Sequence, residues 1–133
     1  MSGGSVFDTG LFGTPGGYEV RIRDLSGANG SEPVEVIRGF ATLEHANAFA
    51  RRYVRDSVER CRAPGMTPEQ VLESWFAYGE DAEIAGREDQ AWRSAAELRD
   101  FARIPVTDAE ERNWRALDPR RYAGDEEEGD EES

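Results

Sequence analysis

The chain has 133 residues and a formal net charge of -12, because 28 acidic residues oppose 16 basic ones, all of them arginine. The lack of lysine excludes a standard phosphate-binding P-loop and lysine-bound pyridoxal phosphate. The single cysteine excludes an internal disulfide, and with only one histidine it excludes a zinc site of His/Cys type within one chain. We therefore expect no cofactor, and the acidic balance disfavours direct binding to nucleic acid or to an anionic membrane.

The first third of the chain predicts an arm followed by a β-hairpin. Residues 1–17 contain six glycines and show little periodicity, which indicates a flexible arm. Tyr18 to Asp24 alternates apolar and polar residues, as a half-buried strand does. Val34 to Phe40 predicts a second strand, and the turn-forming residues around Asn29-Gly30 predict a hairpin with a long loop.

Two helices are expected next. Apolar residues recur at spacings of three and four from Leu43 to Cys61 and predict an amphipathic helix, capped by Thr42, that packs on the hairpin. Thr67 and Gln70 form a capping box at the start of a shorter helix, with Pro68 at its first position.

The remaining elements complete a small α+β domain. Asp81 to Ala85 predicts a third strand, and two further capping boxes predict helices near Ala95 to Arg103 and Asp108 to Leu117. The order β-β-α-α-β-α-α indicates an α+β fold in which helices cover a small antiparallel sheet, the hairpin plus the third strand. We expect this single domain to span residues 18–122. Residues 123–133 contain seven acids and no base, which predicts a disordered acidic tail.

The arm contains Asp8-Thr9-Gly10 after the apolar pair Val6-Phe7, and this stretch resembles the catalytic turn of aspartic proteases. Ile84 to Glu88 is similar to the apolar-apolar-Gly-Arg segment of the retroviral members of that family. The resemblance implies a carboxylate-dependent homodimeric hydrolase in which two copies of Asp8 share a proton. That family has an almost all-β fold with strands before this turn, whereas only seven residues precede Asp8 here. We keep the hydrolase as an alternative only.

His45 and Cys61 do not suit nucleophilic catalysis. They lie 16 residues apart on one predicted helix, about 24 Å at 1.5 Å per residue, so they cannot touch within one chain. His45 falls on the polar face and is expected to be exposed, whereas Cys61 falls on the apolar stripe as an inert buried thiol. The acids of Gly79 to Glu83 lack the spacing of a calcium loop. We expect no catalytic or metal-binding residue.

Arginines on the long predicted helix form a second candidate group. Arg51 and Arg55 lie on one side of it, and grouped guanidinium groups can bind phosphates. Asp56 follows Arg52 by four residues and Glu59 follows Arg55 by four, which predicts local ion pairs and a solvated, salt-bridged surface. Arg51 and Arg55 remain candidate partner-binding residues.

Three aromatic residues lie within four positions of the second predicted helix, at Trp75, Phe76 and Tyr78. They point over a wide arc, so we expect either at least one of them near the surface or a helix sandwiched between two layers. A mostly buried set is one interpretation, and a partner-binding patch is the other. Because tryptophan and tyrosine are enriched at protein interfaces, we select Trp75 and Tyr78 as candidate contact residues. Phe7 and Phe12 of the arm join them.

These observations favour recognition over catalysis. We expect a non-catalytic protein-binding or adaptor domain in the cytoplasm, with a protein partner, and leave a homodimer open. No apolar run in the sequence approaches the roughly 20 residues of a membrane span, and we expect no secretory signal. A second hypothesis is an acidic mimic that competes with nucleic acid for a basic partner. Binding that is lost with added salt and with deletion of residues 124–133 would favour this mimic.

Overall fold

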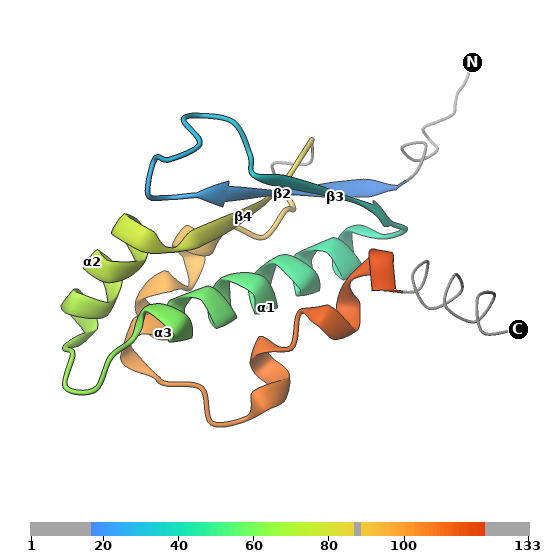
Figure 1. The fold of residues 1–133 in the computed structure, drawn as a ribbon. Helices are drawn as coiled ribbons and strands as arrows, with labels where there is room; N and C mark the ends of the chain where they lie inside the picture. The colour runs from blue at the N-terminus through green and yellow to red at the C-terminus, as the bar shows by residue number, and fades with distance from the viewer. Residues whose placement is uncertain (1–16, 87–88, 122–133) are drawn as a thin grey trace, which may run out of the picture.

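The computed structural model describes residues 17–86 and 89–121, in which a sheet lies on one side and helices lie on the other (Figure 1). The strands are β2 (Tyr18–Asp24), β3 (Glu35–Phe40) and β4 (Glu80–Ile84). They pair antiparallel in the order β3-β2-β4. The predicted α+β class, the hairpin and the third strand are confirmed.

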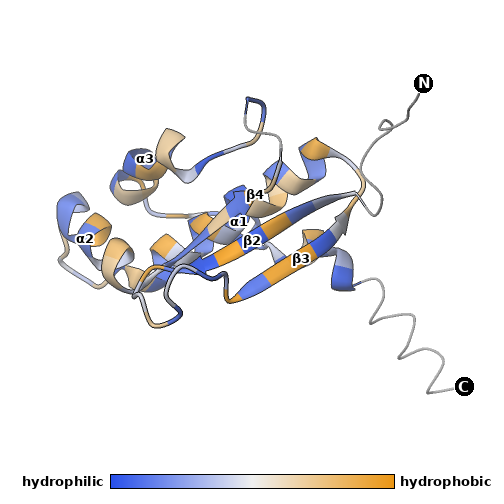
Figure 2. Cartoon of the chain, turned by 90° about the horizontal axis from the view of Figure 1, so that it is seen from above, coloured by the Kyte–Doolittle hydropathy of each residue, from blue (hydrophilic) through white to orange (hydrophobic). Residues whose placement is uncertain are grey.

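Alternation along β2 sorts its side chains between the two faces of the sheet, and Figure 2 shows apolar and hydrophilic residues alternating along this strand. Val20 and Ile22 are fully buried on the face that the helices cover. Arg21 and Arg23 fall on the other face, where Arg23 pairs with Glu83 of β4 at 2.8 Å. The period-two pattern therefore predicts which face of the sheet is covered.

Strand β3 contains an irregularity next to Pro119. The register with β2 shifts between Tyr18 and Val20, where β3 contributes one extra residue. Gly39 has φ of 100°, a left-handed conformation that favours glycine. A Cβ at this position would lie 3.3 Å from the Cβ of Pro119. Glycine at position 39 therefore suits both the backbone conformation of β3 and the close approach of Pro119.

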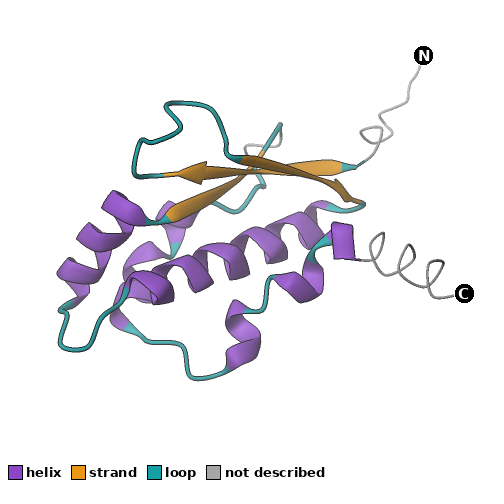
Figure 3. Ribbon diagram, in the orientation of Figure 1, coloured by secondary structure: helices purple, strands orange, loops and turns teal. Residues whose placement is uncertain are grey.

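Helix α1 (Leu43–Cys61) lies beneath the sheet and forms the centre of the core (Figure 3). The Thr42 hydroxyl caps it by accepting a hydrogen bond from the amide of His45 at 3.1 Å. Because apolar residues recur every three or four positions, one face of the helix is buried, as the sequence predicts. The apolar residues that it buries are Ala46, Phe49, Ala50, Tyr53, Val54 and Val58.

Two further helices pack with α1. Helix α2 (Pro68–Tyr78) begins with the predicted capping box, in which Thr67 and Gln70 each bond the other's backbone amide. Helix α3 (Leu98–Arg103) follows a single 3-10 turn, Ser94–Ala96, and packs against α2. The predicted helix near 95–103 is thus present, with a 3-10 turn in place of its first residues.

The last predicted helix, Asp108 to Leu117, is present as two short 3-10 turns, Ala109–Arg112 and Arg115–Leu117. Asn113 and Trp114 separate them, and the side-chain oxygen of Asn113 accepts a hydrogen bond from the amide of Ala116 at 3.3 Å. Such local side-chain bonds compete with a continuous helix. We call residues 105–121 the C-terminal segment, which lies along α1 (Figure 1).

The prediction that His45 is exposed is wrong. His45 is half-buried, and its Nε2 donates to the carbonyl oxygen of Leu117 at 2.7 Å. Its ring meets Phe40 edge-on, with the ring centroids 4.9 Å apart. The partner carbonyl comes from the C-terminal segment, 72 residues away, so the helix periodicity could not reveal it.

Three expectations concern residues or properties that the structure does not test. The predicted acidic tail, and the arm up to residue 16, lie outside the described residues. Within the described ranges, no helix is long and apolar enough to cross a membrane. The cytoplasmic location stays a prediction.

Candidate functional site

Trp75 and Phe76 are neighbours on α2 with different surroundings. Trp75 is 1% exposed, and its indole nitrogen donates to the hydroxyl of Ser57 on α1 at 3.1 Å. The same hydroxyl accepts a hydrogen bond from the amide of Glu80 at 2.9 Å. Ser57 therefore joins α1, α2 and the start of β4. Trp75, selected from the sequence as a contact residue, is part of the core and not of the exposed surface.

Phe76 is 57% exposed, although its ring packs edge-on against Trp75 with the centroids 5.1 Å apart. Leu72 lies one turn before Phe76, so the two side chains form an apolar row on the outside of α2. A shallow depression is lined by Leu72, Phe76 and Ala77 together with Glu69 and Glu73. We call these five residues the Phe76 surface.

Glu69 and Glu73 form the acidic rim of the Phe76 surface. Both are exposed, and they lie four residues apart, where like charges repel each other weakly along a helix. Neither carboxylate has a hydrogen-bond or ion-pair partner among residues 17–86 and 89–121. Helix α2 itself contains no basic residue. The negative charge of the rim is therefore not neutralised by the part of the chain that the structure describes.

Tyr78 is 77% exposed, at the surface position that the sequence predicts for at least one of the three aromatics. It lies in a separate depression beside Arg60, Cys61 and Glu80. Cys61 is half-buried, and burial raises the pKa of its thiol, which disfavours the reactive thiolate. Tyr78 is thus accessible, but its neighbours are polar and it is not part of the Phe76 surface.

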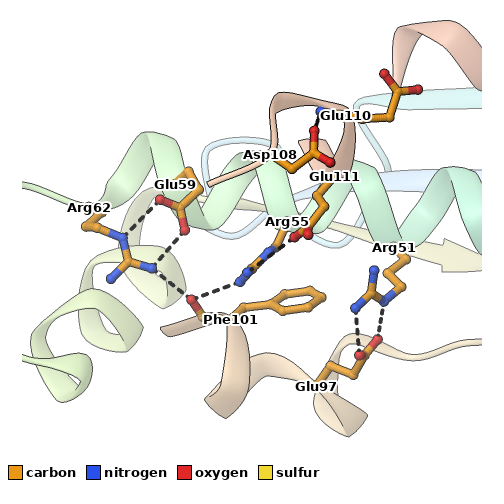
Figure 4. Close-up of polar contacts among 9 residues, drawn as sticks. All are labelled: Arg51, Arg55, Glu59, Arg62, Glu97, Phe101, Asp108, Glu110 and Glu111. Atoms are coloured by element: carbon orange, nitrogen blue, oxygen red, sulfur yellow. Dashed lines mark hydrogen bonds and ion pairs between the residues drawn. The ribbon is translucent and has the colours of Figure 1, made fainter. Parts of the chain in front are cut away.

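The candidate Arg51 is held by a carboxylate. Its Nε and Nη2 donate to the two carboxylate oxygens of Glu97 at 2.6 and 2.9 Å (Figure 4). The indole nitrogen of Trp92 also donates to Glu97, at 2.8 Å. The Arg51 guanidinium holds the pKa of Glu97 below its ordinary value. This bidentate pair ties α1 to the residue that precedes α3.

The candidate Arg55 is buried beneath α3 and the C-terminal segment. Its guanidinium lies over the ring of Phe101, 4.6 Å from the centroid, and donates to the carbonyl oxygen of Phe101 at 3.2 Å. Arg62 donates to the same carbonyl at 2.8 Å and pairs with Glu59 (Figure 4). Arg55 and Arg62 therefore join α1 to α3, and Arg55 does not reach the exposed surface.

The arginines and acids that were expected to pair along α1 bind other partners in the structure. Arg52 pairs with Glu110 at 3.1 Å, and Arg55 lies 3.7 Å from Glu111, so both bind acids of the C-terminal segment. The acids that were predicted as their partners are bound by other arginines: Asp56 by Arg60 and Arg112, and Glu59 by Arg62. The two predicted pairs are therefore wrong. The arginines bind acids of the C-terminal segment, and the acids bind other local arginines, with Arg112 as a further partner of Asp56. The surface is salt-bridged as expected.

We predict that the Arg51–Glu97 pair stabilises the folded state at neutral pH and that this stabilisation is lost at low pH. Because the folded-state pKa of Glu97 is lowered, this contribution is fully present above the unfolded pKa and is lost as the pH falls through the folded pKa. We expect Glu97→Gln to lower the free energy of unfolding at neutral pH by less than about 1 kcal/mol, since both side chains are partly exposed.

Urea unfolding measured from about pH 7 to about pH 3 checks this, since the unfolded carboxyl titrates in the lower part of this range. The free energy of unfolding of Glu97→Gln should fall less steeply with decreasing pH than that of the wild type. Glu32→Gln, which changes an exposed carboxylate without an ion-pair partner in the described residues, should keep the wild-type slope. If Glu97→Gln kept the wild-type slope, the predicted stabilisation by the Arg51–Glu97 pair would be wrong.

The remaining sequence hypotheses concern the hydrolase, the contacts of the arm and the expected lack of a metal site. Asp8, Phe7 and Phe12 lie outside the described residues, so the hydrolase and arm-contact hypotheses remain untested. Among the described residues, no group of three or more histidine, cysteine, aspartate or glutamate side chains is placed to hold a metal ion.

The Phe76 surface is only partly visible in the sequence. Val71 and Trp75 form one row with a spacing of four residues, and Leu72 and Phe76 form a parallel row. Two adjacent apolar rows on one helix are the signal that one row lies outside the core.

No protein-family model matches the chain, and searches of curated proteins and of solved structures found no match.

Proposed function

We propose that this chain is a protein-binding domain and that a partner protein covers the Phe76 surface of α2. The observation that carries the proposal is the 57% exposure of Phe76 in an apolar row with Leu72, directly beside the buried Trp75. Aromatic side chains with this placement are the usual anchors of protein interfaces. Because Phe76 is already partly buried, covering the rest of its ring contributes less than the roughly 1.5–3 kcal/mol of a fully exposed side chain.

The inner face of α2 makes this surface a rigid one. Val71 is fully buried, Trp75 is bonded to Ser57, and the capping box at Thr67 fixes the first turn. A platform that is already ordered loses little conformational freedom when a partner binds, which favours affinity. The Phe76 surface therefore suits a contact better than a mobile loop would.

The arginine candidates support the same choice. The two guanidinium groups of Arg51 and Arg55 are already bound by Glu97 and by the Phe101 carbonyl. A partner that recruited either group would first have to break a contact that joins α1 to its neighbours. The exposed row on α2 requires no such rearrangement.

A site-specific photo-crosslinker tests the proposal in the native cell. We expect p-benzoylphenylalanine at position 76 to form an adduct with one partner protein, and the same group at position 34 to form none. Val34 is the matched control because it is 44% exposed, on the strand side of the molecule.

The dissociation constant for the purified partner then tests whether Phe76 contributes to binding. Phe76→Ala should raise the dissociation constant about tenfold or more, as loss of an aromatic anchor does. Val34→Ala should leave it unchanged. An unchanged dissociation constant for Phe76→Ala, or adducts that form equally at positions 34 and 76, would refute the proposed function.

A further inference from the structure

We infer that the occupant of the Phe76 surface is a basic amphipathic helix of another protein, with large apolar side chains flanked by lysine or arginine. The inference rests on the proposed function and specifies the chemistry of the partner. Three features of the described residues support it: the charge of the rim, the spacing of the apolar row, and the charges that the chain itself can offer.

The charge of the rim selects a cationic partner. Glu69 and Glu73 flank the apolar row, and neither is paired within the described residues. A partner that buries Phe76 must approach both carboxylates, so a neutral or acidic surface would bring them close to apolar or like-charged groups. Lysine or arginine at the margin of the partner would instead form ion pairs that steer and orient the encounter.

The spacing of the apolar row selects a helix. Leu72 and Phe76 are four residues apart, so their side chains form one ridge along α2, with Ala77 leaving space beside it. Ridges of this spacing pack into the grooves between side chains of a second helix. An amphipathic helix reaches such a surface through apolar side chains repeated every three or four residues.

The chain's own termini do not supply this chemistry. Residues 1–16 contain one acid and no base, and residues 122–133 contain seven acids and no base. Neither terminus could neutralise Glu69 and Glu73. Helix α2 also lacks a basic residue, so its own sequence offers no complementary charge.

The same charges disfavour a second copy of the chain, paired through its own α2, as the occupant. A symmetric antiparallel pairing of α2 through this surface would centre near Glu73 and place this residue opposite its own copy. Both chains also have a net charge of -12, which opposes their association. A heterologous basic helix meets the apolar row without this repulsion.

Three synthetic peptides of about 18 residues, long enough for several helical turns, test the inference against the full-length chain. The basic peptide has a leucine row flanked by lysines. Its acidic twin has glutamate in place of every lysine, and its polar twin has serine in place of every leucine. Binding is followed by the amide chemical shifts of the isotope-labelled protein, which report where each peptide binds.

We expect the basic peptide to shift the amides of residues 69–77 and both twins to leave them unchanged. The dissociation constant of the basic peptide should rise about fivefold in Glu69→Gln/Glu73→Gln, since two exposed ion pairs are lost. The matched control is Glu32→Gln/Glu44→Gln, which removes the same charge from exposed positions outside α2. It should keep the wild-type value.

Several results would overturn the inference. Equal binding of the acidic twin would show that the rim does not select charge, and equal binding of the polar twin at residues 69–77 would show that the apolar row is not needed. An equal loss of affinity in Glu32→Gln/Glu44→Gln would assign the effect to the net charge of the protein. Shifts confined to residues outside 69–77 would place the basic helix elsewhere.

The failure of this inference can be told apart from that of the proposed function. If Phe76→Ala weakens binding to the crosslinked partner but Glu69→Gln/Glu73→Gln does not, the protein-binding function stands and the basic helix is wrong. If Phe76→Ala leaves that binding unchanged, the proposed function is wrong whatever the peptides do.

Discussion

Trp75→Ala is expected to lower the free energy of unfolding by about 3–5 kcal/mol, the usual cost of removing a large aromatic side chain from a core. The indole is 1% exposed and lies between α1, α2 and the start of β4. Its loss leaves a cavity and removes the donor that bonds the Ser57 hydroxyl. The packing is close here, because a Cβ on Gly79 would lie 2.3 Å from Cδ1 of Trp75.

Urea unfolding followed by circular dichroism measures this change, with Phe76→Ala as the matched control on the same helix. Because Phe76 is 57% exposed, its removal should cost less than about 1 kcal/mol. If Trp75→Ala does not fold, Trp75→Phe replaces it in the measurement. Phenylalanine fills most of the space but lacks the indole donor, so this variant should fold and be less stable than the wild type. Equal effects of Trp75→Ala and Phe76→Ala would contradict the burial of Trp75.

The same pair of residues shows where sequence reasoning about the site succeeds and where it fails. The expectation that at least one of the aromatics on α2 lies near the surface is confirmed, since Phe76 and Tyr78 are both exposed. The choice between Trp75 and Phe76 depends on the position of Ser57, 18 residues away on another helix. Residue type favours tryptophan as an interface residue, whereas the tertiary partner places it in the core.

Much of the fold follows from short-range patterns. The strand β2, the helix α1 and the capping box of α2 are predicted correctly because alternation, helical periodicity and caps involve residues within a few positions of each other. The partners of the arginines on α1 cannot be predicted in this way. Arg51 and Arg52 are bound by acids 46 and 58 residues away, and only the tertiary fold brings these together.

The C-terminal segment is the region where local signals mislead. A capping box and apolar positions predict one helix, but the side chains of Asp108 and Asn113 bond nearby amides and divide it into 3-10 turns. These turns are then held by partners on α1, chiefly Asp56 and His45. The segment therefore depends on contacts with the rest of the domain rather than on its own helix propensity.

Asp56→Ala is accordingly expected to weaken this segment more than any change to its exposed ion pairs. One carboxylate oxygen of Asp56 accepts a hydrogen bond from Nε of Arg112 at 2.7 Å, and the other accepts one from the indole of Trp114 at 3.1 Å. The Trp114 ring in turn packs against Tyr53 and Phe49 of α1, with centroids 4.9 and 5.9 Å apart. Loss of a buried charged acceptor with these two donors should cost about 2–3 kcal/mol.

Two variants and two measurements separate this effect from a general loss of charge. Asp56→Asn keeps the shape but offers one acceptor oxygen to two donors, so its stability in urea should lie between those of the wild type and Asp56→Ala. Glu110→Ala, which breaks the exposed pair with Arg52, should cost less than about 1 kcal/mol. In Asp56→Ala the amides of Leu117 and Asp118, which are hydrogen-bonded within the segment, should exchange with solvent faster than the global unfolding requires. Wild-type stability and exchange in Asp56→Ala would show that the other contacts of the segment hold it without Asp56.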